Sequence, residues 1–169
     1  EIFAHTGDSK WAERLEMRAF NALPATLSED MWTHQYVQQV NQIACQKTMI
    51  MAPWSTNGPY AHTFGLEPNF GCCTANFNQA WPKFVLATFM HNGKDIVNTI
   101  PVPCTLESEN AKISLETDYP FNNTFRYTID SKTDFTFTVR IPSFAENVSV
   151  NGKTLTGGDV VLPIEGGMV

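Results

Sequence analysis

Residues 135–141, FTFTVRI, alternate apolar and polar side chains without a break. Strict alternation of this kind is typical of a strand with one buried face. The same alternation occurs in residues 113–117 and 125–129, and Asn151-Gly152 between two short apolar runs is a strong hairpin signal. Several short strands with turns between them predict an antiparallel β-sandwich in the second half of the chain.

The composition of the chain changes near residue 91. All four Trp and all four His lie in residues 1–91. Val, Ile and Thr occupy 24 of the 78 positions after residue 91, against 14 of the 91 positions up to it. Because β-branched residues favour strands, the later part is predicted to be β, and the earlier part to be helical. Helices first and strands afterwards indicate an α+β chain of two modules, residues 1–91 and 92–169.

Charge and hydropathy exclude several classes of protein. The 169-residue chain is 43% hydrophobic, which excludes disorder as its main state. Its formal net charge is −6 and it has no run of basic residues, so we expect neither nucleic acid nor a membrane surface as a partner. No apolar stretch approaches the roughly 18 residues that a membrane-spanning helix needs. The chain begins without an initiator Met and stops abruptly, so we expect a piece of a longer protein.

The first module is predicted to begin with an amphipathic helix. Asp8 or Ser9 is suited to cap it, and Pro24, which lacks a backbone donor, ends it after about Ala22. The charged residues of this stretch are expected mostly on its exposed face. Its buried face is expected to carry four residues at helical spacing: Trp11, Leu15, Ala19 and Ala22.

The rest of the first module is less regular. Residues 31–50 have an ambiguous period, with helix and strand both open, and residues 51–71 hold three Pro and three Gly and are predicted to form a loop. Thr74 is suited to cap a second helix, with Pro82 in its first turn or at a kink. The inward face of that helix is expected to carry five residues: Phe77, Trp81, Phe84, Val85 and Phe89.

The sharpest feature of the chain is the adjacent pair Cys72-Cys73. Adjacent cysteines rarely form a disulfide with each other, because their Cα atoms, about 3.8 Å apart, are closer than a disulfide normally allows. Two thiols just before a helix feel the positive end of its dipole, which favours the thiolate. A thiolate is a nucleophile and a zinc ligand, whereas two buried, inert cysteines are the alternative. No CxxC or HExxH motif supplies further zinc ligands.

A set of motifs surrounds the cysteine pair, which itself lies in GCCTANFNQAWPKF, residues 71–84. Upstream lie TGDSKWAERLE, FNALP, DMW and QYVQQVNQ, at residues 6–16, 20–24, 30–32 and 35–42. Downstream lie DYPF, VRIP and VNG, at residues 118–121, 139–142 and 150–152. As a set and in this order, these stretches resemble the family-127-like glycoside hydrolases, whose founding members are β-L-arabinofuranosidases. The resemblance spans nearly the whole chain.

The resemblance implies a fold and a site. The family folds as an (α/α)6 barrel of helical hairpins followed by a β-sandwich, so residues 1–91 are expected to form the C-terminal part of the catalytic barrel and residues 92–169 the start of the sandwich. It implies a retaining hydrolase of L-arabinofuranoside-type plant or microbial glycans, in which Cys72 is the nucleophile and a zinc ligand and Cys73 a second zinc ligand. Tyr36 falls near an active-site tyrosine of the family. The thiolate takes the place of the usual carboxylate nucleophile of retaining glycosidases.

The chain departs from the family pattern upstream of the pair. The family's Glu-x-Cys zinc ligands and its acid/base Glu lie upstream of the part matched here, and nothing before Cys72 in this chain supplies a Glu-x-Cys. We therefore expect the isolated chain to be inactive and to self-associate through exposed barrel helices. Residues 67–71 also differ from the founding members, which leaves the sugar open, and Glu67 is a candidate to enter the site.

A few other aromatic and imidazole side chains are candidates for contact with a sugar. His34 and His62 can line a sugar pocket or be hydrogen-bonded structural residues. Trp32 and Trp54 can stack on a sugar ring or pack in the core. The sequence alone leaves both alternatives open for each of them.

The remaining features concern thiols, localisation and a second class of function. Cys45 and Cys104 are expected to be free, buried thiols, with a disulfide between them as the alternative in a secreted protein. Asn122 and Asn147 begin N-glycosylation sequons. A polysaccharide substrate favours secretion, whereas a thiolate pair suits a reducing compartment, so localisation stays open with a lean toward the extracellular space. The alternative to a hydrolase is a non-catalytic β-sandwich module that binds carbohydrate or a protein partner and has lost activity.

Overall fold

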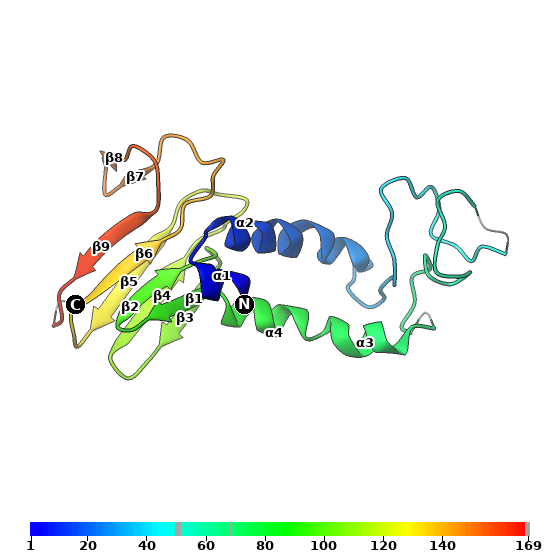
Figure 1. The fold of residues 1–169 in the computed structure, drawn as a ribbon, viewed down its shortest axis with the longest axis horizontal. Coiled ribbons are helices and arrows are strands. Elements are labelled where there is room, and N and C mark those ends of the chain that lie inside the picture. The colour runs from blue at the N-terminus through cyan, green and yellow to red at the C-terminus, as the bar shows by residue number, and fades with distance from the viewer. Residues whose placement is uncertain (50–51, 68, 168–169) are drawn as a thin grey trace. The chain divides into compact units, whose positions relative to one another are not determined.

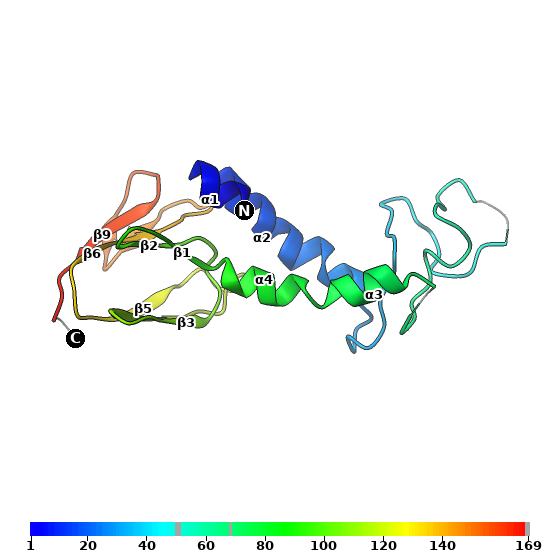
Figure 2. The same cartoon turned by 60° about the horizontal axis from the view of Figure 1, so that its bottom comes forward.

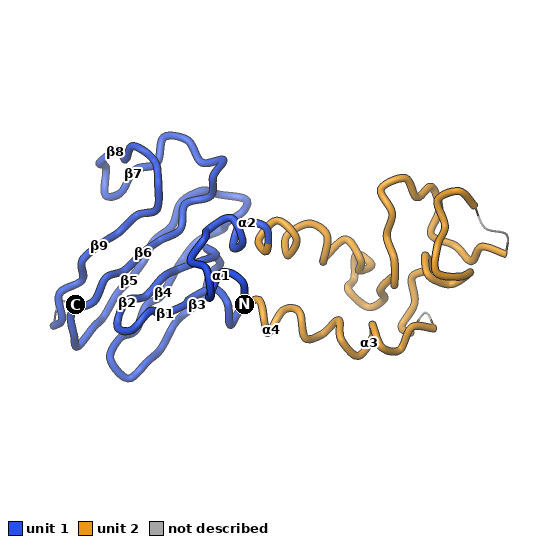
Figure 3. Tube along the Cα trace, in the orientation of Figure 1, with its two compact units in different colours: residues 1–14, 85–169 blue, residues 15–84 orange. Residues whose placement is uncertain are grey.

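The structure of the protein is a computed structural model that describes residues 1–49, 52–67 and 69–167. The chain divides into two compact units (Figure 3): residues 1–14 with the described part of 85–169, and residues 15–84. Helices and irregular segments make up residues 15–84, whereas the strands all lie in the other unit (Figure 1). The predicted α+β class is therefore confirmed.

The first helices begin and end where local signals dictate. Helix α1, Ile2–Thr6, ends at Gly7 in a left-handed conformation with φ of 66°. Helix α2, Lys10–Met17, is continued by a π-helical turn, Arg18–Ala22. The Asp8 carboxylate accepts the backbone N–H of Lys10 at 3.1 Å, which confirms the predicted cap. Pro24 then begins a 3-10 turn, Pro24–Thr26, so the predicted end of the long helix is also confirmed.

The predicted buried face of the first helix is correct at Ala19 and wrong in α2 itself. Ala12 and Glu16 are the buried residues of α2, whereas Leu15 is 40% exposed. Ala22 is exposed as well. Within α2 the buried residues are offset by one position from the predicted ones, a rotation of about 100°. Trp11 is half-buried with the Arg14 guanidinium 4.9 Å from its ring centre, so cation–π contact at the surface takes the place of burial in the core.

Residues 27–70 contain no helix or ladder strand in the part of the chain that is described. Neither alternative for residues 31–50 is therefore correct over residues 31–49, and the loop predicted for residues 51–71 is confirmed for 52–67 and 69–70. Ile50, Met51 and Pro68 lie outside the described residues. Long-range backbone bonds hold this region together, because residues 34–37 bond to residues 26–27 on one side and 61–65 on the other.

Two helices replace the single one predicted after the loop. Helix α3 is Gly71–Phe77 and helix α4 is Ala80–Leu86, which crosses from one unit into the other. Pro82 lies in the first turn of α4, one of the two predicted placements, where its missing N–H costs nothing. Thr74 does not cap a helix, because α3 already begins at Gly71. Of the predicted inward face, Phe84 is buried, but Val85 is 54% exposed.

The strands form two larger sheets and a short hairpin. The first sheet has the order β1-β2-β6-β9, with β1 Phe89–Asn92, β2 Asp95–Asn98, β6 Phe135–Val139 and β9 Val160–Ile164. The second has the order β3-β4-β5, with β3 Cys104–Glu107, β4 Ala111–Glu116 and β5 Arg126–Ser131. The hairpin joins β7 Ser149–Val150 to β8 Lys153–Thr154. All pairs are antiparallel except β2 with β6, which the sequence did not predict.

The two larger sheets face each other around one hydrophobic core (Figure 2). Tyr127 of β5 meets Phe137 of β6 edge to face at 5.2 Å, across the space between the sheets. The Tyr127 hydroxyl donates to the Asn98 side-chain oxygen at 2.7 Å, so the one polar group of this pair is satisfied. The buried residues of the core come from both sheets: Ile96, Ala111, Ile113, Phe135, Phe137, Val139 and Val160.

The alternation predicted over residues 135–141 is confirmed through Val139. Phe135, Phe137 and Val139 are all buried, and Asn151-Gly152 forms the predicted turn with positive φ at both residues. Arg140 breaks the alternation, because it is only 1% exposed and donates its Nε–H to the Thr99 carbonyl. In the described part of the chain, no helix combines the length and the apolar character needed to cross a membrane.

Candidate functional site: the thiol pair

Cys72 and Cys73 lie in the first turn of α3, not before the helix as predicted. The backbone N–H of Cys73 donates to the carbonyl of Phe70, the residue that precedes the helix, at 2.9 Å. The two Sγ atoms are 3.7 Å apart. Cys72 is exposed and Cys73 is half-buried, so the first thiol is open to an incoming molecule and the second is partly covered.

The electrostatic environment differs from the one expected for a helix N-terminus. The pKa of the Cys73 thiol is raised, first by partial burial and then by its hydrogen bond and charge interaction with Cys72. Two thiolates this close repel each other, so the second proton is harder to remove from the pair. For Cys73 the net shift is therefore opposite to that expected from the helix dipole.

The spacing of the two sulfur atoms can be compared with a zinc site. Tetrahedral zinc with Zn–S bonds of about 2.3 Å places two sulfur ligands about 3.8 Å apart. The observed 3.7 Å between Cys72 Sγ and Cys73 Sγ fits that geometry. No group of three or more His, Cys, Asp or Glu side chains suited to hold a metal occurs among the described residues. The pair thus fits two of the ligand positions of a zinc site.

The other two cysteines are separate from the pair and are free thiols, as predicted. Cys45 is exposed, so its predicted burial is wrong; it lies in the irregular segment, where the Gln42 amide contacts its sulfur at 3.3 Å. Cys104 is half-buried in β3. Burial raises the pKa of Cys104, and its contact with the Thr88 hydroxyl opposes this in part.

His34 contacts the helix that carries the pair. Its Nε2 lies 3.2 Å from the hydroxyl of Thr74, the residue directly after Cys73. Its ring stacks parallel to Phe77 of the same helix, with centroids 5.8 Å apart and 7° between the planes. His34 is 9% exposed. The structure therefore brings His34 to α3, though against its inner side.

Tyr36 also lies close to the start of α3. Its ring stacks on Phe70, with centroids 3.8 Å apart and 4° between the planes. Phe70 directly precedes the helix and is two residues before Cys72. Of the predicted sugar-binding residues, Tyr36 and His34 are thus the two that touch the segment holding the thiols.

Trp32 and Glu67 are not brought to α3 by any hydrogen bond or ring contact in the described part of the chain. Trp32 is 73% exposed, and its backbone N–H is held by the Asp30 carboxylate at 3.0 Å. Glu67 is exposed, and its carbonyl accepts the backbone N–H of Asn69 at 2.9 Å. Their proposed contacts with a sugar stay predictions.

A buried hydrogen-bonded network surrounds His62, whose partners the sequence did not predict. His62 is fully buried; its Nε2 accepts the Thr56 backbone N–H at 3.0 Å, and its Nδ1 lies 2.8 Å from the Gln42 side-chain oxygen. The Gln35 amide donates to the His62 carbonyl at 2.8 Å. Trp54 packs edge-on against the His62 ring at 5.4 Å and is itself buried. His62 and Trp54 therefore have the structural roles that the sequence analysis gave as one of two alternatives for each residue.

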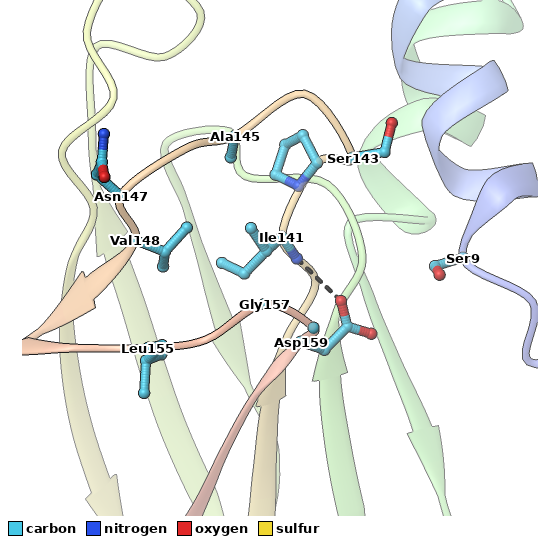
Figure 4. A pocket seen from close by; sticks show the side chains of 11 residues that line it. Ser9, Ile141, Ser143, Ala145, Asn147, Val148, Leu155, Gly157 and Asp159 are labelled. Atoms are coloured by element: carbon cyan, nitrogen blue, oxygen red, sulfur yellow. Dashed lines mark hydrogen bonds between the residues drawn. The ribbon is translucent and has the colours of Figure 1, made fainter.

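A separate pocket of about 350 Å³ lies in the unit that holds the strands (Figure 4). Its floor is apolar, from Ile141, Val148 and Leu155, and the Asp159 carboxylate at its edge accepts the backbone N–H of Ile141 at 3.0 Å. None of the predicted site residues lines it. It lacks the aromatic ring that usually stacks on a sugar.

Comparisons with known proteins bear on this arrangement. Residues 96–162 match the family model described as Beta-L-arabinofuranosidase, GH127 middle domain. A solved GH127 beta-L-arabinofuranosidase from Geobacillus stearothermophilus T6 is similar, with 19% identity, a TM-score of 0.62, and coverage of 96% of this chain and 27% of that one. A second, described as a glycoside hydrolase, has 17% identity, a TM-score of 0.70, and coverage of 98% and 29%. No curated protein matches the chain.

These matches show likeness, first to a class of proteins and then to a family. The two structural matches are at low identity and concern the fold, and this chain spans less than a third of the length of either protein. With the family match on the strands, they make the chain glycoside-hydrolase-like. More particularly, the chain is GH127-like, as its motifs predicted.

Proposed function

We propose that the chain supplies the nucleophile of a retaining glycoside hydrolase that acts on L-arabinofuranoside-type glycans. The observation that carries the proposal is the thiol pair, with its sulfur atoms 3.7 Å apart at the start of a helix in a GH127-like chain. In this proposal residues 1–91 correspond to the C-terminal part of an (α/α)6 barrel and residues 92–169 to a β-sandwich. Carbohydrate is then the substrate.

Cys72 acts first in the proposed reaction. Its sulfur is exposed, so a sugar can approach it directly. The thiolate forms a bond to the anomeric carbon while the bond to the leaving oxygen breaks and that oxygen takes a proton from a general acid. Water then displaces the sulfur from the glycosyl-cysteine, which restores the original anomeric configuration. Within this chain Glu67 is the candidate acid.

Cys72 and Cys73 are the residues that would hold a zinc ion. When bound, zinc supplies a positive charge that keeps cysteine sulfur in the thiolate form at neutral pH. That role matters most for Cys73, whose pKa is raised by burial and by its neighbour. Tyr36, His34, Trp32 and Glu67 are the residues proposed to line or shape the sugar site, and the exposed indole of Trp32 is free to stack on a sugar face.

The test is affinity labelling of the intact chain. An N-bromoacetyl β-L-arabinofuranosylamine alkylates a thiolate by loss of bromide and needs no general acid, and plain bromoacetamide is the matched reagent without a sugar. Mass spectrometry gives the ratio of labelling at Cys72 to labelling at Cys45, which is also exposed. We expect the sugar to raise this ratio, and Cys72→Ser to remove the label. An equal ratio with both reagents would refute sugar recognition at Cys72.

A second sugar separates substrate from mechanism. The glucopyranosyl form of the same reagent carries the same reactive group on a different ring. Stronger labelling of Cys72 by the arabinofuranosyl form supports the proposed substrate. Stronger labelling by the glucopyranosyl form would keep Cys72 as the nucleophile but overturn the arabinofuranoside assignment.

A further inference from the structure

We infer that His34 is a positioning residue for the thiol pair: through Thr74 and Phe77 it holds the inner side of α3 so that Cys72 faces outward. The inference rests on the proposed function of Cys72 and Cys73. It gives His34 a role different from contact with the sugar, because the ring is almost completely buried and its Nε2 already bonds to Thr74.

The contacts of His34 select one side of the helix. Thr74 and Phe77 are three residues apart and therefore neighbours on one face of α3. Cys73, Thr74 and Phe77 are half-buried, whereas Cys72 is exposed. Contact from His34 to the half-buried face thus fixes which of the two adjacent thiols is covered and which is open.

Helix α3 depends on tertiary contacts such as this one for its stability, because it is short. It has seven residues and no side-chain cap at its start. A helix this short is unstable alone in water, since the first turn costs more conformational entropy than its bonds return. The stacking of Tyr36 on Phe70 supports the residue before the helix, and His34 supports the helix itself.

The backbone of His34 is held by bridges to two other segments, which fixes the position of its ring. Its N–H donates to the Gly65 carbonyl at 3.1 Å and its carbonyl accepts the Gly65 N–H at 3.2 Å. A second bridge pairs His34 with Leu27. The next residue, Gln35, is tied to the buried His62 carbonyl at 2.8 Å. The imidazole therefore extends to α3 from a segment that long-range bonds hold on both sides.

The test measures thiol accessibility in the intact chain with iodoacetamide, read by mass spectrometry at each cysteine. His34→Phe keeps a ring to stack on Phe77 but loses the bond to Thr74, and Thr74→Val removes the hydroxyl with little change in shape. The matched control is Thr63→Val, which removes a hydroxyl that donates to the nearby Tyr60 carbonyl at 2.7 Å, within the same turn. Cys45, in the same unit, and Cys104, in the other, are the reference thiols.

We expect His34→Phe and Thr74→Val each to raise alkylation of Cys73, relative to both reference thiols, by about fivefold, the factor that matches the roughly 1 kcal/mol of one hydrogen bond. The double variant should show no more than either single one, because both remove the same bond. His34→Gln, which keeps a polar group near the position of Nε2, should restore most of the protection.

Three results would overturn the inference: unchanged Cys73 labelling in both single variants, an equal rise in Thr63→Val, or effects that add in the double variant. A second readout is the ultraviolet sulfur-to-cadmium absorption on titration with Cd²⁺ alone. We expect about fivefold weaker Cd²⁺ binding in His34→Phe and Thr74→Val, with rescue by His34→Gln; equal affinity in all variants would contradict positioning of the pair. Neither assay uses a sugar, so they succeed or fail independently of the affinity labelling.

Discussion

Replacing His62 by Phe should open the irregular segment that supports the thiol helix. The imidazole is fully buried, and its two nitrogens bond to the Thr56 N–H at 3.0 Å and to the Gln42 side-chain oxygen at 2.8 Å. Because Nε2 accepts from the Thr56 N–H, the ring is neutral with its proton on Nδ1. A phenyl ring preserves much of the shape and the edge-on contact with Trp54, but it satisfies neither polar partner.

The size of the effect follows from the two groups left without partners. A buried donor or acceptor that loses its hydrogen bond costs about 1–3 kcal/mol. Gln42 is partly exposed and can turn to water, whereas the Thr56 amide is fixed in the backbone, so we expect a loss of about 1–3 kcal/mol in the free energy of local opening. This corresponds to a rise of roughly 5- to 150-fold in exchange of the amides that open with this segment.

Hydrogen exchange read by mass spectrometry on peptides from residues 52–67 measures this directly. His91→Phe is the matched control, because His91 is exposed in β1. The increase should reach residues 34–37 as well, since Gln35 bonds to the His62 carbonyl and Val37 to Ala61. Exchange in His62→Phe that matches His91→Phe would refute the structural role given to His62.

Three further predictions concern the core, the half-buried thiol of Cys104 and the activity of the chain. Tyr127→Phe should destabilise the strand-bearing unit by about 1–3 kcal/mol in denaturant unfolding, because the Asn98 side-chain oxygen loses its donor. Thr128→Val, at an exposed neighbouring position, is the control. Equal stability of Tyr127→Phe and the unchanged chain would contradict a stabilising role for this hydrogen bond. Because burial raises the pKa of Cys104, its thiol stays protonated where an ordinary one has ionised, so the midpoint of its alkylation rate against pH should lie above that of free N-acetylcysteine. A midpoint at or below that of N-acetylcysteine would be the opposite result. The 169-residue chain alone should show no sustained release of 4-nitrophenol from 4-nitrophenyl β-L-arabinofuranoside, because its site is not fully formed. Steady turnover that Cys72→Ser abolishes would disprove this and would make Glu67 the first residue to test as the general acid.

The sequence predicted those parts of the fold that depend on neighbouring residues. The Asp8 cap, the alternation of Phe135, Phe137 and Val139, and the Asn151-Gly152 turn are all local signals, and the structure has each of them. In each case a few adjacent residues decide the outcome. Periodicity therefore sufficed for β6, the strand with three residues in the core.

Features that depend on distant residues were not predictable in this way. His34 is paired with Gly65, 31 residues away, and with Thr74, 40 residues away, so no local period reveals its role. The same reason explains why residues 31–49 had an ambiguous period: their backbone bonds go to other irregular segments. Arg140 looked like an outward polar position, yet it is buried because the Thr99 carbonyl accepts its Nε–H.

In the candidate site, too, local features were predictable from the sequence and contacts between distant residues were not. The closeness of Cys72 and Cys73 was visible in the sequence because the residues are adjacent. Their Sγ atoms are 3.7 Å apart within one helical turn. The contacts of His34 and Tyr36 with this helix segment required the folded chain. The predicted sugar contacts of Trp32 and Glu67 found no such support.

The central claim is that Cys72 forms a covalent bond to the anomeric carbon of an arabinofuranoside. A 2,4-dinitrophenyl β-L-arabinofuranoside tests it most directly, because its leaving group departs without a proton from a general acid. The measurement is the intact mass of the chain after incubation, followed by peptide mapping of the modified residue. The account predicts one pentosyl group per chain on Cys72, absent from Cys72→Ser and retained in Cys45→Ser. An unmodified chain, or a pentosyl group that persists in Cys72→Ser, would contradict it.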